Sequence, residues 1–384
     1  MKYDKRGVSA DKKDVHEAIK NQDKGLYPDA FCKILPDSIY KDPEYAMLMH
    51  ADTAGTKTVL AYLYWKESGD LSVWEGIVQD AIVMNIDDMA CAGALDDFVL
   101  SSTMGRNKNL ITAEVIKTII ESAQKLTGKF ADLGFNLYLA GGETADVGDI
   151  VRTIDIGFTA YARLKRDQVI RINPQEADVI VGLESGGQST YEENYNSGIG
   201  CNGLTFARHE LLDKSYAEKY PESFDPHMDP AYVYTRQFKL MDESKITGKN
   251  IGQLLLSPTR TYLPVIAQVS REIKDGIHGI IHNTGGGQTK ILHFIDKQLI
   301  VKDNLLDIPP VFQYIREQAN TDWKEMFQVF NMGQRLEFYT HEKNAERIIS
   351  IAKGYNIHAQ VVGHVEKSTS KRLLIKHKGN KYSY

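Results

Sequence analysis

Residues 137–146 read Leu-Tyr-Leu-Ala-Gly-Gly-Glu-Thr-Ala-Asp, a short apolar run that passes into two glycines and an acid. The first four of these residues have the length and composition of a strand. Gly141 and Gly142 free the backbone after it and present Glu143 at its end. Because α/β folds bind ligands at strand ends, the segment predicts such a fold with Glu143 as a candidate site residue. A plain acid in a loop is the alternative.

Strands and helices alternate on both sides of this segment, which predicts an α/β or mixed α+β fold. A strand over residues 45–50 precedes a helix over 71–94 that is apolar on most sides, as buried helices are. The pattern restarts after residue 164, so we predict an N-terminal domain of residues 1–168 and a C-terminal domain of residues 169–384. Further strands are predicted over 151–164, 178–184, 277–282, 335–339 and 359–366, and further helices over 112–133, 203–212, 343–353 and 257–274, the last capped by Ser257 with Pro258 in its first turn.

Composition narrows the class of protein. The 384 residues carry a formal net charge of −5 and no long basic run, which argues against a nucleic-acid partner. Cys32, Cys91 and Cys201 are scattered and odd in number, so they fit small buried residues in a reducing compartment better than a disulfide framework. No apolar run reaches the roughly 20 residues that a membrane span needs. We therefore expect a cytoplasmic protein without a membrane partner.

Three clusters carry candidate chemistry. Asp52-Thr53-Ala54-Gly55-Thr56-Lys57 follows a strand, where glycine lets backbone N–H groups approach a phosphate and Lys57 can neutralise it. Asp87 and Asp88 lie in an otherwise apolar helix, although carboxylates are rarely buried without a partner or metal. Asp52, Asp88 and Glu143 would together give Mg²⁺ the hard oxygen ligands it prefers, which suits phosphoryl transfer from ATP. A strand–helix junction and a salt bridge at a helix end explain the first two clusters equally well.

The chain resembles the aminoimidazole ribonucleotide synthetase superfamily of ATP-dependent enzymes over almost its whole length. The segment 52–57, the acidic helix at Asp87-Asp88-Met89 and the motif Gly141–Ala145 match motifs that the superfamily shares. Three later motifs resemble those of its cyclo-ligase branch in particular. They are Ser257-Pro258-Thr259-Arg260-Thr261-Tyr262, His282-Asn283-Thr284-Gly285-Gly286-Gly287 and Phe330-Asn331-Met332-Gly333.

The resemblance implies a fold, a reaction and a set of site residues. The family has two α/β domains, dimerises through its N-terminal strands and builds ATP sites near the dimer interface. The branch closes the imidazole of aminoimidazole ribonucleotide from a phosphoribosyl substrate, formylglycinamidine ribonucleotide, through an iminophosphate. The implied metal ligands are Asp52, Asp88 and Glu143; the catalytic residues are His282, Lys57 and Lys20; and the cofactor or phosphate contacts are Thr56, Gly141, Gly142, Thr144, Arg260, Thr284, Gly285, Gly286 and Asn331.

The chain departs from the family pattern where substrate and lid contacts are expected. The glycine-rich segment before the first strand is replaced by residues 29–34, and the family's Gly-Pro-His-Ser-Asn-Gly is residues 198–203 here, without the histidine. An inserted, tyrosine-rich stretch, residues 188–197, precedes it. Two alternatives therefore stay open: another ATP-dependent member of the superfamily that phosphorylates a carbonyl oxygen, or a non-catalytic ATP-binding paralogue.

Overall fold

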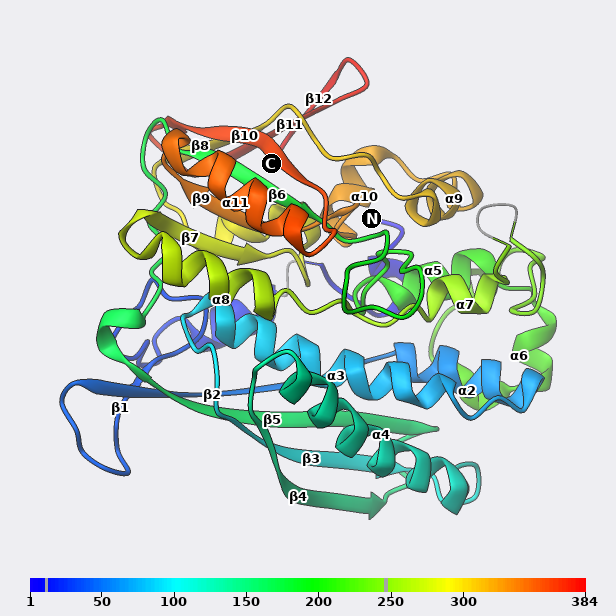
Figure 1. The fold of residues 1–384 in the computed structure, drawn as a ribbon. Helices are drawn as coiled ribbons and strands as arrows, with labels where there is room; N and C mark the ends of the chain where they lie inside the picture. The colour runs from blue at the N-terminus through cyan, green and yellow to red at the C-terminus, as the bar shows by residue number, and fades with distance from the viewer. Residues whose placement is uncertain (11–12, 245–247) are drawn as a thin grey trace.

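The computed structural model describes residues 1–10, 13–244 and 248–384, and it contains two β-sheets, one in each half of the chain (Figure 1). In the first half, strands alternate with two long helices that lie against the sheet. The elements of this half are α1 (Lys13–Ile19), β1 (Leu35–Pro36), β2 (Tyr45–Thr53), α2 (Lys57–Ser68), α3 (Val73–Cys91), β3 (Phe98–Arg106), α4 (Ala113–Asp132), β4 (Leu137–Asp146) and β5 (Ile154–Lys165).

The five-stranded sheet has the order β1-β2-β5-β3-β4, with β3 and β4 parallel and the other pairs antiparallel. Helices α3 and α4 cover one of its faces (Figure 1). Along β2, Ala46 and Leu48 point to the helices and are buried. Met49 points to the opposite face of the sheet and is exposed. This alternation is the pattern of a strand with one buried face. The other face of the sheet carries no helix among the described residues.

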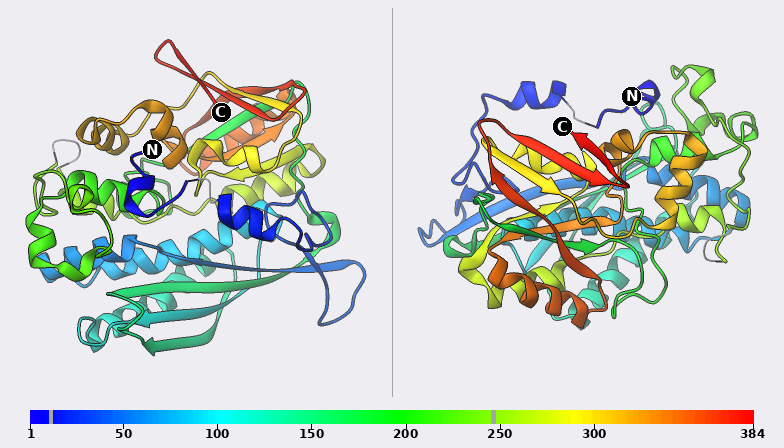
Figure 2. Two further views of the ribbon diagram at one scale, coloured as in Figure 1. Left: turned by 180° about the vertical axis from the view of Figure 1, so that it is seen from behind. Right: turned by 90° about the horizontal axis from the view of Figure 1, so that it is seen from above.

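The second half is built around a seven-stranded sheet of order β12-β11-β8-β10-β6-β9-β7. Helix α11 packs on β6 and β10 and also touches α8 (Figure 2). The strands are β6 (Val179–Glu184), β7 (Ile277–His282), β8 (Gln298–Lys302), β9 (Gln334–Thr340), β10 (Ala359–Lys367), β11 (Arg372–His377) and β12 (Asn380–Ser383). The helices are α5 (Leu204–Leu211), α6 (Ser215–Lys219), α7 (Ile251–Leu255), α8 (Leu263–Glu272), α9 (Pro310–Ala319), α10 (Trp323–Val329) and α11 (Glu342–Gly354), with the 3-10 helix η6 (Gly287–His293) after β7.

Helix α3 lies between the two halves, because it contacts β2 and β5 on one side and α8 and β7 on the other. Its buried acids explain the contact. The Asp80 carboxylate accepts hydrogen bonds from the N–H and hydroxyl of Thr259 at 2.7 Å, and Asp87 accepts from the Thr261 hydroxyl at 2.6 Å and the Tyr262 N–H at 2.8 Å. Seven residues are two helical turns, so both acids project from one side of α3 onto the same loop. The role of Asp87 is therefore to anchor the second half.

Most predicted elements are present, and two predictions are wrong. The helix predicted over 257–274 is a loop up to Tyr262, and α8 begins at Leu263 with Pro264 in its first turn. Residues 257–262 stay outside the helix because Asp80 and Asp87 accept hydrogen bonds from Thr259, Thr261 and Tyr262. Residues 141–146 form no loop; they continue β4 as an edge strand beside β3. Within the described helices, none combines the length and the apolarity that crossing a bilayer requires.

Candidate active site

The candidate site begins on the helix-facing side of β2, near its end. The Nδ1 of His50 donates to the Asn85 Oδ1 at 3.0 Å, and its Nε2 lies 3.6 Å from a carboxylate oxygen of Asp88. Asp52 lies two residues further on the same side of β2. Burial, together with the nearby charge of Asp88, raises the pKa of the Asp52 carboxyl. Two carboxylates that repel each other in this way fit a site for a divalent cation.

A buried histidine and an arginine hold Asp88 in place. The Nδ1 of His282, at the end of β7, lies 2.7 Å from Asp88, and its Nε2 accepts a hydrogen bond from the Arg335 Nε at 3.0 Å. Burial lowers the pKa of His282 to about 4, so the ring is neutral at physiological pH. Because Arg335 can only donate, the single ring proton stays on Nδ1 and points at the Asp88 carboxylate. Burial favours the neutral Asp88 carboxyl, but the hydrogen bond and nearby cations outweigh it and lower its pKa.

The opposite wall of the site is formed by the turn after β7. Lys290, in η6, donates through Nζ to the Thr284 hydroxyl at 3.0 Å, and its ammonium lies 5.2 Å from the ring centre of Phe31. Its charge also acts on both Asp52 and Asp88. The Sγ of Cys32 donates to the backbone carbonyl of Asp88 at 3.3 Å. The segment 29–34 therefore contacts Asp88 through Cys32 and Lys290 through Phe31.

Glu143 does not lie beside the two aspartates in one chain. Across the sheet, Thr53 is paired with Gly157, Gly157 with Thr103 and Thr103 with Glu143. Three strand spacings separate Glu143 from the end of β2, which is about 14 Å. Glu143 lies on the exposed edge strand with its neighbours Gly141, Gly142 and Thr144. A Cβ on Gly142 would lie 2.1 Å from the Ser102 hydroxyl, so tight strand packing requires this glycine.

Three residues that were predicted to contact phosphate or cofactor are engaged inside the protein. Lys57 is completely buried, with Nζ 2.8 Å from the Asp80 carboxylate and 2.6 Å from the Ser257 carbonyl. The buried guanidinium of Arg260 donates from Nε and Nη2 to one oxygen of Glu192, at 2.9 and 2.6 Å. Asn331 accepts from the Ser185 hydroxyl and donates to the Gly198 carbonyl. These three side chains support the fold, because their polar groups are satisfied by protein atoms.

The structure also shows the surroundings of two residues with predicted catalytic roles, which stay predictions. His282, predicted to polarise the substrate or move a proton, is completely buried, and both of its ring nitrogens are engaged, one of them with Asp88. Lys20 is exposed and forms an ion pair with Glu17 at 3.4 Å. Thr56 is exposed at the start of α2, where its hydroxyl lies 2.7 Å from that of Thr205. Gly285 and Gly286 form the turn between Thr284 and η6, so they remain close to Lys290.

The inserted stretch 188–197 packs into the protein. The Tyr191 hydroxyl donates to the Thr261 carbonyl at 2.6 Å, and the Asn196 side chain donates to the Pro258 carbonyl at 2.7 Å. With the Glu192–Arg260 pair, these contacts fasten the insertion to the loop 257–262 that Asp80 and Asp87 hold from the other side. The insertion therefore supports, from within the second half, the loop that α3 of the first half holds.

Sequence reasoning missed His50, Lys290 and Arg335. The sequence held one indication of a side chain such as Arg335 near position 200, because residue 200 is glycine where the family has a histidine. A Cβ at Gly200 would lie 1.8 Å from the Arg335 Nη1, so the guanidinium fills the space that a side chain at position 200 would take. A glycine at position 200 thus leaves room for the Arg335 guanidinium beside His282.

Comparison with known proteins identifies the family. A family model described as AIR synthase related protein, N-terminal domain, matches residues 29–164, and the corresponding C-terminal domain model matches residues 175–376. The chain belongs to the AIR synthase related family. The resemblance and the two-domain fold predicted from the motifs are confirmed, while the boundary at residues 168 and 169 stays a prediction.

Relatives of this AIR synthase related chain include two proteins named phosphoribosylformylglycinamidine cyclo-ligase. The protein of Methanocaldococcus jannaschii is 30% identical over 331 residues, which cover 85% of this chain and 79% of the relative. The protein of Methanococcus vannielii is 31% identical over 330 residues, which cover 84% and 78%. The crystal structure of thiamine-monophosphate kinase from Stenotrophomonas maltophilia superposes with a TM-score of 0.52 over 97% of both chains. At 13% identity, this last likeness shows the shared fold alone.

Proposed function

We propose that this chain is a cytoplasmic, ATP-dependent cyclo-ligase that converts formylglycinamidine ribonucleotide into aminoimidazole ribonucleotide. The observation that carries the proposal is the convergence of Asp52, Asp88 and Lys290 from both halves of the chain at one place. Relatives of the same family that bear the cyclo-ligase name support the choice of substrate. The two carboxylates suit the binding of the cation that accompanies a nucleoside triphosphate, and the lysine suits the binding of its phosphates.

The residues present fit Mg²⁺ in part. Asp52 and Asp88 would hold it, and their mutual repulsion, seen in the raised pKa of Asp52, would be relieved by a divalent cation. Bound Mg²⁺ would supply charge neutralisation to the phosphates of ATP. His282 and Arg335 fix the orientation of the Asp88 carboxylate. Lys290, with Thr284 beside it, places a cation on the opposite side of the site.

The reaction needs the two ends of one substrate to be held together. The formyl oxygen attacks the γ-phosphorus of ATP, and ADP leaves. The amidine nitrogen then attacks the carbon that bears the new phosphate, the imidazole ring closes, and the former formyl oxygen leaves with the phosphate. Phosphorylation thus converts a poor leaving group into a good one, and orientation by the protein lowers the entropic part of the barrier.

The direct test is phosphate release from ATP and Mg²⁺ with and without formylglycinamidine ribonucleotide, together with detection of the aminoimidazole product. Release that depends on the substrate and matches product formation is the expected result. ATP binding without this turnover would overturn the substrate assignment and favour another carbonyl substrate or a non-catalytic paralogue.

We also propose that the chain forms a homodimer through the bare face of the five-stranded sheet. Met49, Tyr161, Val99 and Tyr138 are directly paired across β2, β5, β3 and β4, so they form one row. Exposed fractions of 57% for Met49, 36% for Val99 and 52% for Tyr138 leave this row open to solvent. A contiguous apolar patch on a sheet face is typical of an interaction surface.

A charge in the middle of this row is expected to separate the dimer. We expect Val99→Lys to give a particle of 43.2 kDa by light scattering, against twice that mass for the unchanged chain. The control is Ile120→Lys, which places the same charge on the exposed side of α4, where Ile120 is 55% exposed. A monomeric unchanged chain, or a dimer that tolerates Val99→Lys, would contradict the proposed surface.

Dimerisation would also explain why Glu143 is remote from Asp52. We propose that Glu143 of the partner subunit completes the acidic set. Asp88→Asn and Glu143→Gln should then each be inactive alone. When the two variants are mixed, half of the random dimers contain one subunit of each kind, and one of the two sites in such a dimer has both acids intact. The mixture should therefore recover about a quarter of the activity. Mixing that restores no activity would place Glu143 outside the shared site.

A further inference from the structure

Asp178, His278 and His341 form a second cluster of ionisable side chains, away from the acidic pair. Among the residues that the structure describes, these three offer ligand atoms that all lie within 4.8 Å of one another. Asp178 directly precedes β6, His278 lies in β7 and His341 directly precedes α11. Three separate elements of the second half therefore bring these side chains to one point. We propose that this cluster is a binding site for a Zn²⁺-type divalent transition metal.

The distances suit one small ion. The Nδ1 of His278 lies 2.9 and 2.8 Å from the two oxygens of Asp178, and the Nδ1 of His341 lies 3.5 Å from Oδ1. For Zn–ligand distances of about 2.0–2.1 Å, the ligands of a tetrahedral site are about 3.3 Å apart. Both imidazoles thus present Nδ1 to the same carboxylate at nearly this separation. The two rings stand perpendicular, with centroids 4.5 Å apart, so they do not block each other.

The charges also point to a cation. Asp178 is completely buried, and its ion-pair partners among the described residues are the two imidazoles. A bound divalent cation would compensate the charge of this buried carboxylate. The Asp88–His282 pair differs, because Arg335 lies beside it. Two imidazole nitrogens and one carboxylate oxygen form a set of ligands that suits Zn²⁺ or Co²⁺. Mg²⁺, in contrast, prefers a set of oxygen ligands alone.

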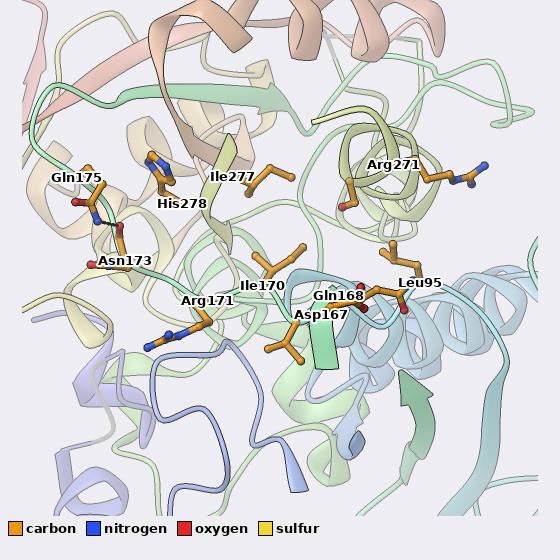
Figure 3. Close-up of a pocket in the computed structure, with 12 residues that line it drawn as sticks. Leu95, Asp167, Gln168, Ile170, Arg171, Asn173, Gln175, Arg271, Ile277 and His278 are labelled. Carbon is orange, nitrogen blue, oxygen red and sulfur yellow. Dashed lines mark hydrogen bonds between the residues drawn. The ribbon is translucent and has the colours of Figure 1, made fainter. Parts of the chain in front are cut away.

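The surroundings hold the ligands in place and leave access. The Gln175 N–H donates to the Asp178 Oδ2 at 2.7 Å, and the Asn173 N–H donates to the His278 carbonyl at 2.7 Å. His278 lines a cavity of 440 Å³. Figure 3 shows its side chain near those of Asn173 and Gln175, which also line the cavity. The side chain of His341 is 53% exposed. A metal can therefore enter from solvent, and water can complete its coordination.

The experiment is a titration with Co²⁺ of the full chain after treatment with a chelator, in excess Mg²⁺ and in an Asp88→Asn background so that the acidic pair does not contribute. We expect the visible absorption bands of tetrahedral Co²⁺ to saturate at one ion per chain and to be displaced by Zn²⁺. His341→Ala, at a half-exposed position that folding tolerates, should weaken binding at least about 100-fold, as should His278→Ala and Asp178→Asn.

Matched controls are His227→Ala and His364→Ala, because each of these histidines faces one exposed carboxylate, Asp225 and Glu366. Both controls should bind Co²⁺ like the parent. Zn²⁺ should also raise the melting temperature of the parent and of the controls but not of His341→Ala. Absence of the tetrahedral bands, or equal affinity of parent and His341→Ala, would overturn the proposal. The test does not depend on catalytic activity, so it stands apart from the proposed function.

Discussion

Replacing Asp88 with Asn is expected to lower kcat/KM for ATP-dependent turnover by about 100-fold or more while leaving the fold intact. The amide oxygen of the new side chain can still accept the hydrogen bond from the His282 Nδ1, so the packing around residue 88 is preserved. The negative charge that would hold Mg²⁺ is lost, and about 3 kcal/mol of transition-state stabilisation corresponds to a 100-fold loss of rate. Steady-state phosphate release and ATP affinity at limiting Mg²⁺ measure the effect.

The neighbouring acid is the matched control. The Asp87 carboxyl faces Thr261 and Tyr262, and burial raises its pKa to about 7, so at neutral pH Asp87→Asn removes only about half of a unit charge. Turnover of Asp87→Asn should therefore stay near that of the unchanged chain, with at most a moderate loss of thermal stability. If Asp88→Asn binds ATP normally at limiting Mg²⁺, or if both variants lose activity equally, Asp88 is not a metal ligand.

Replacing Lys57 with Met is expected to destabilise the protein strongly. Lys57 and Asp80 are both completely buried, and removal of the ammonium would leave the Asp80 carboxylate charged without a counter-ion. Breaking a buried pair in this way costs about 3–5 kcal/mol. A loss of this size corresponds to a melting temperature lower by roughly 5–10 °C. Below its melting temperature the variant should keep its ATP affinity, because Lys57 does not face the site.

Two comparisons make this prediction specific. Lys125→Met removes an exposed lysine that pairs with Glu75, and such surface pairs contribute at most about 1 kcal/mol. In the double variant Lys57→Met/Asp80→Asn no charge of this buried pair remains, and the amide oxygen that replaces the carboxylate can still accept from Thr259, so part of the stability should return. A Lys57→Met protein that is stable but no longer binds ATP would restore the phosphate-binding role predicted from the sequence.

Part of the site was predictable from sequence because some side chains indicate their environment. Asp88 in an apolar helix had to find a partner or a cation, and the structure places it beside His282 and near Asp52. Lys57 and Arg260 gave no such sign. Lys57 follows a glycine turn and Arg260 lies in a Pro-Thr-Arg motif. These local sequences are the same whether the side chain binds a phosphate or a protein carboxylate. Their partners, Asp80 and Glu192, lie 23 and 68 residues away.

The sequence by itself determined the alternation of strands and helices, the buried character of α3 and the family, because hydrophobic periodicity and local motifs are properties of neighbouring residues. It misjudged residues 257–262, where local capping signals favoured a helix but hydrogen bonds to Asp80 and Asp87 hold the chain in a loop. Only the tertiary structure decided which acids face the site, which anchor the second half, and that Glu143 lies three strands from Asp52. These outcomes depend on strand order and on partners distant in sequence, which no local pattern encodes.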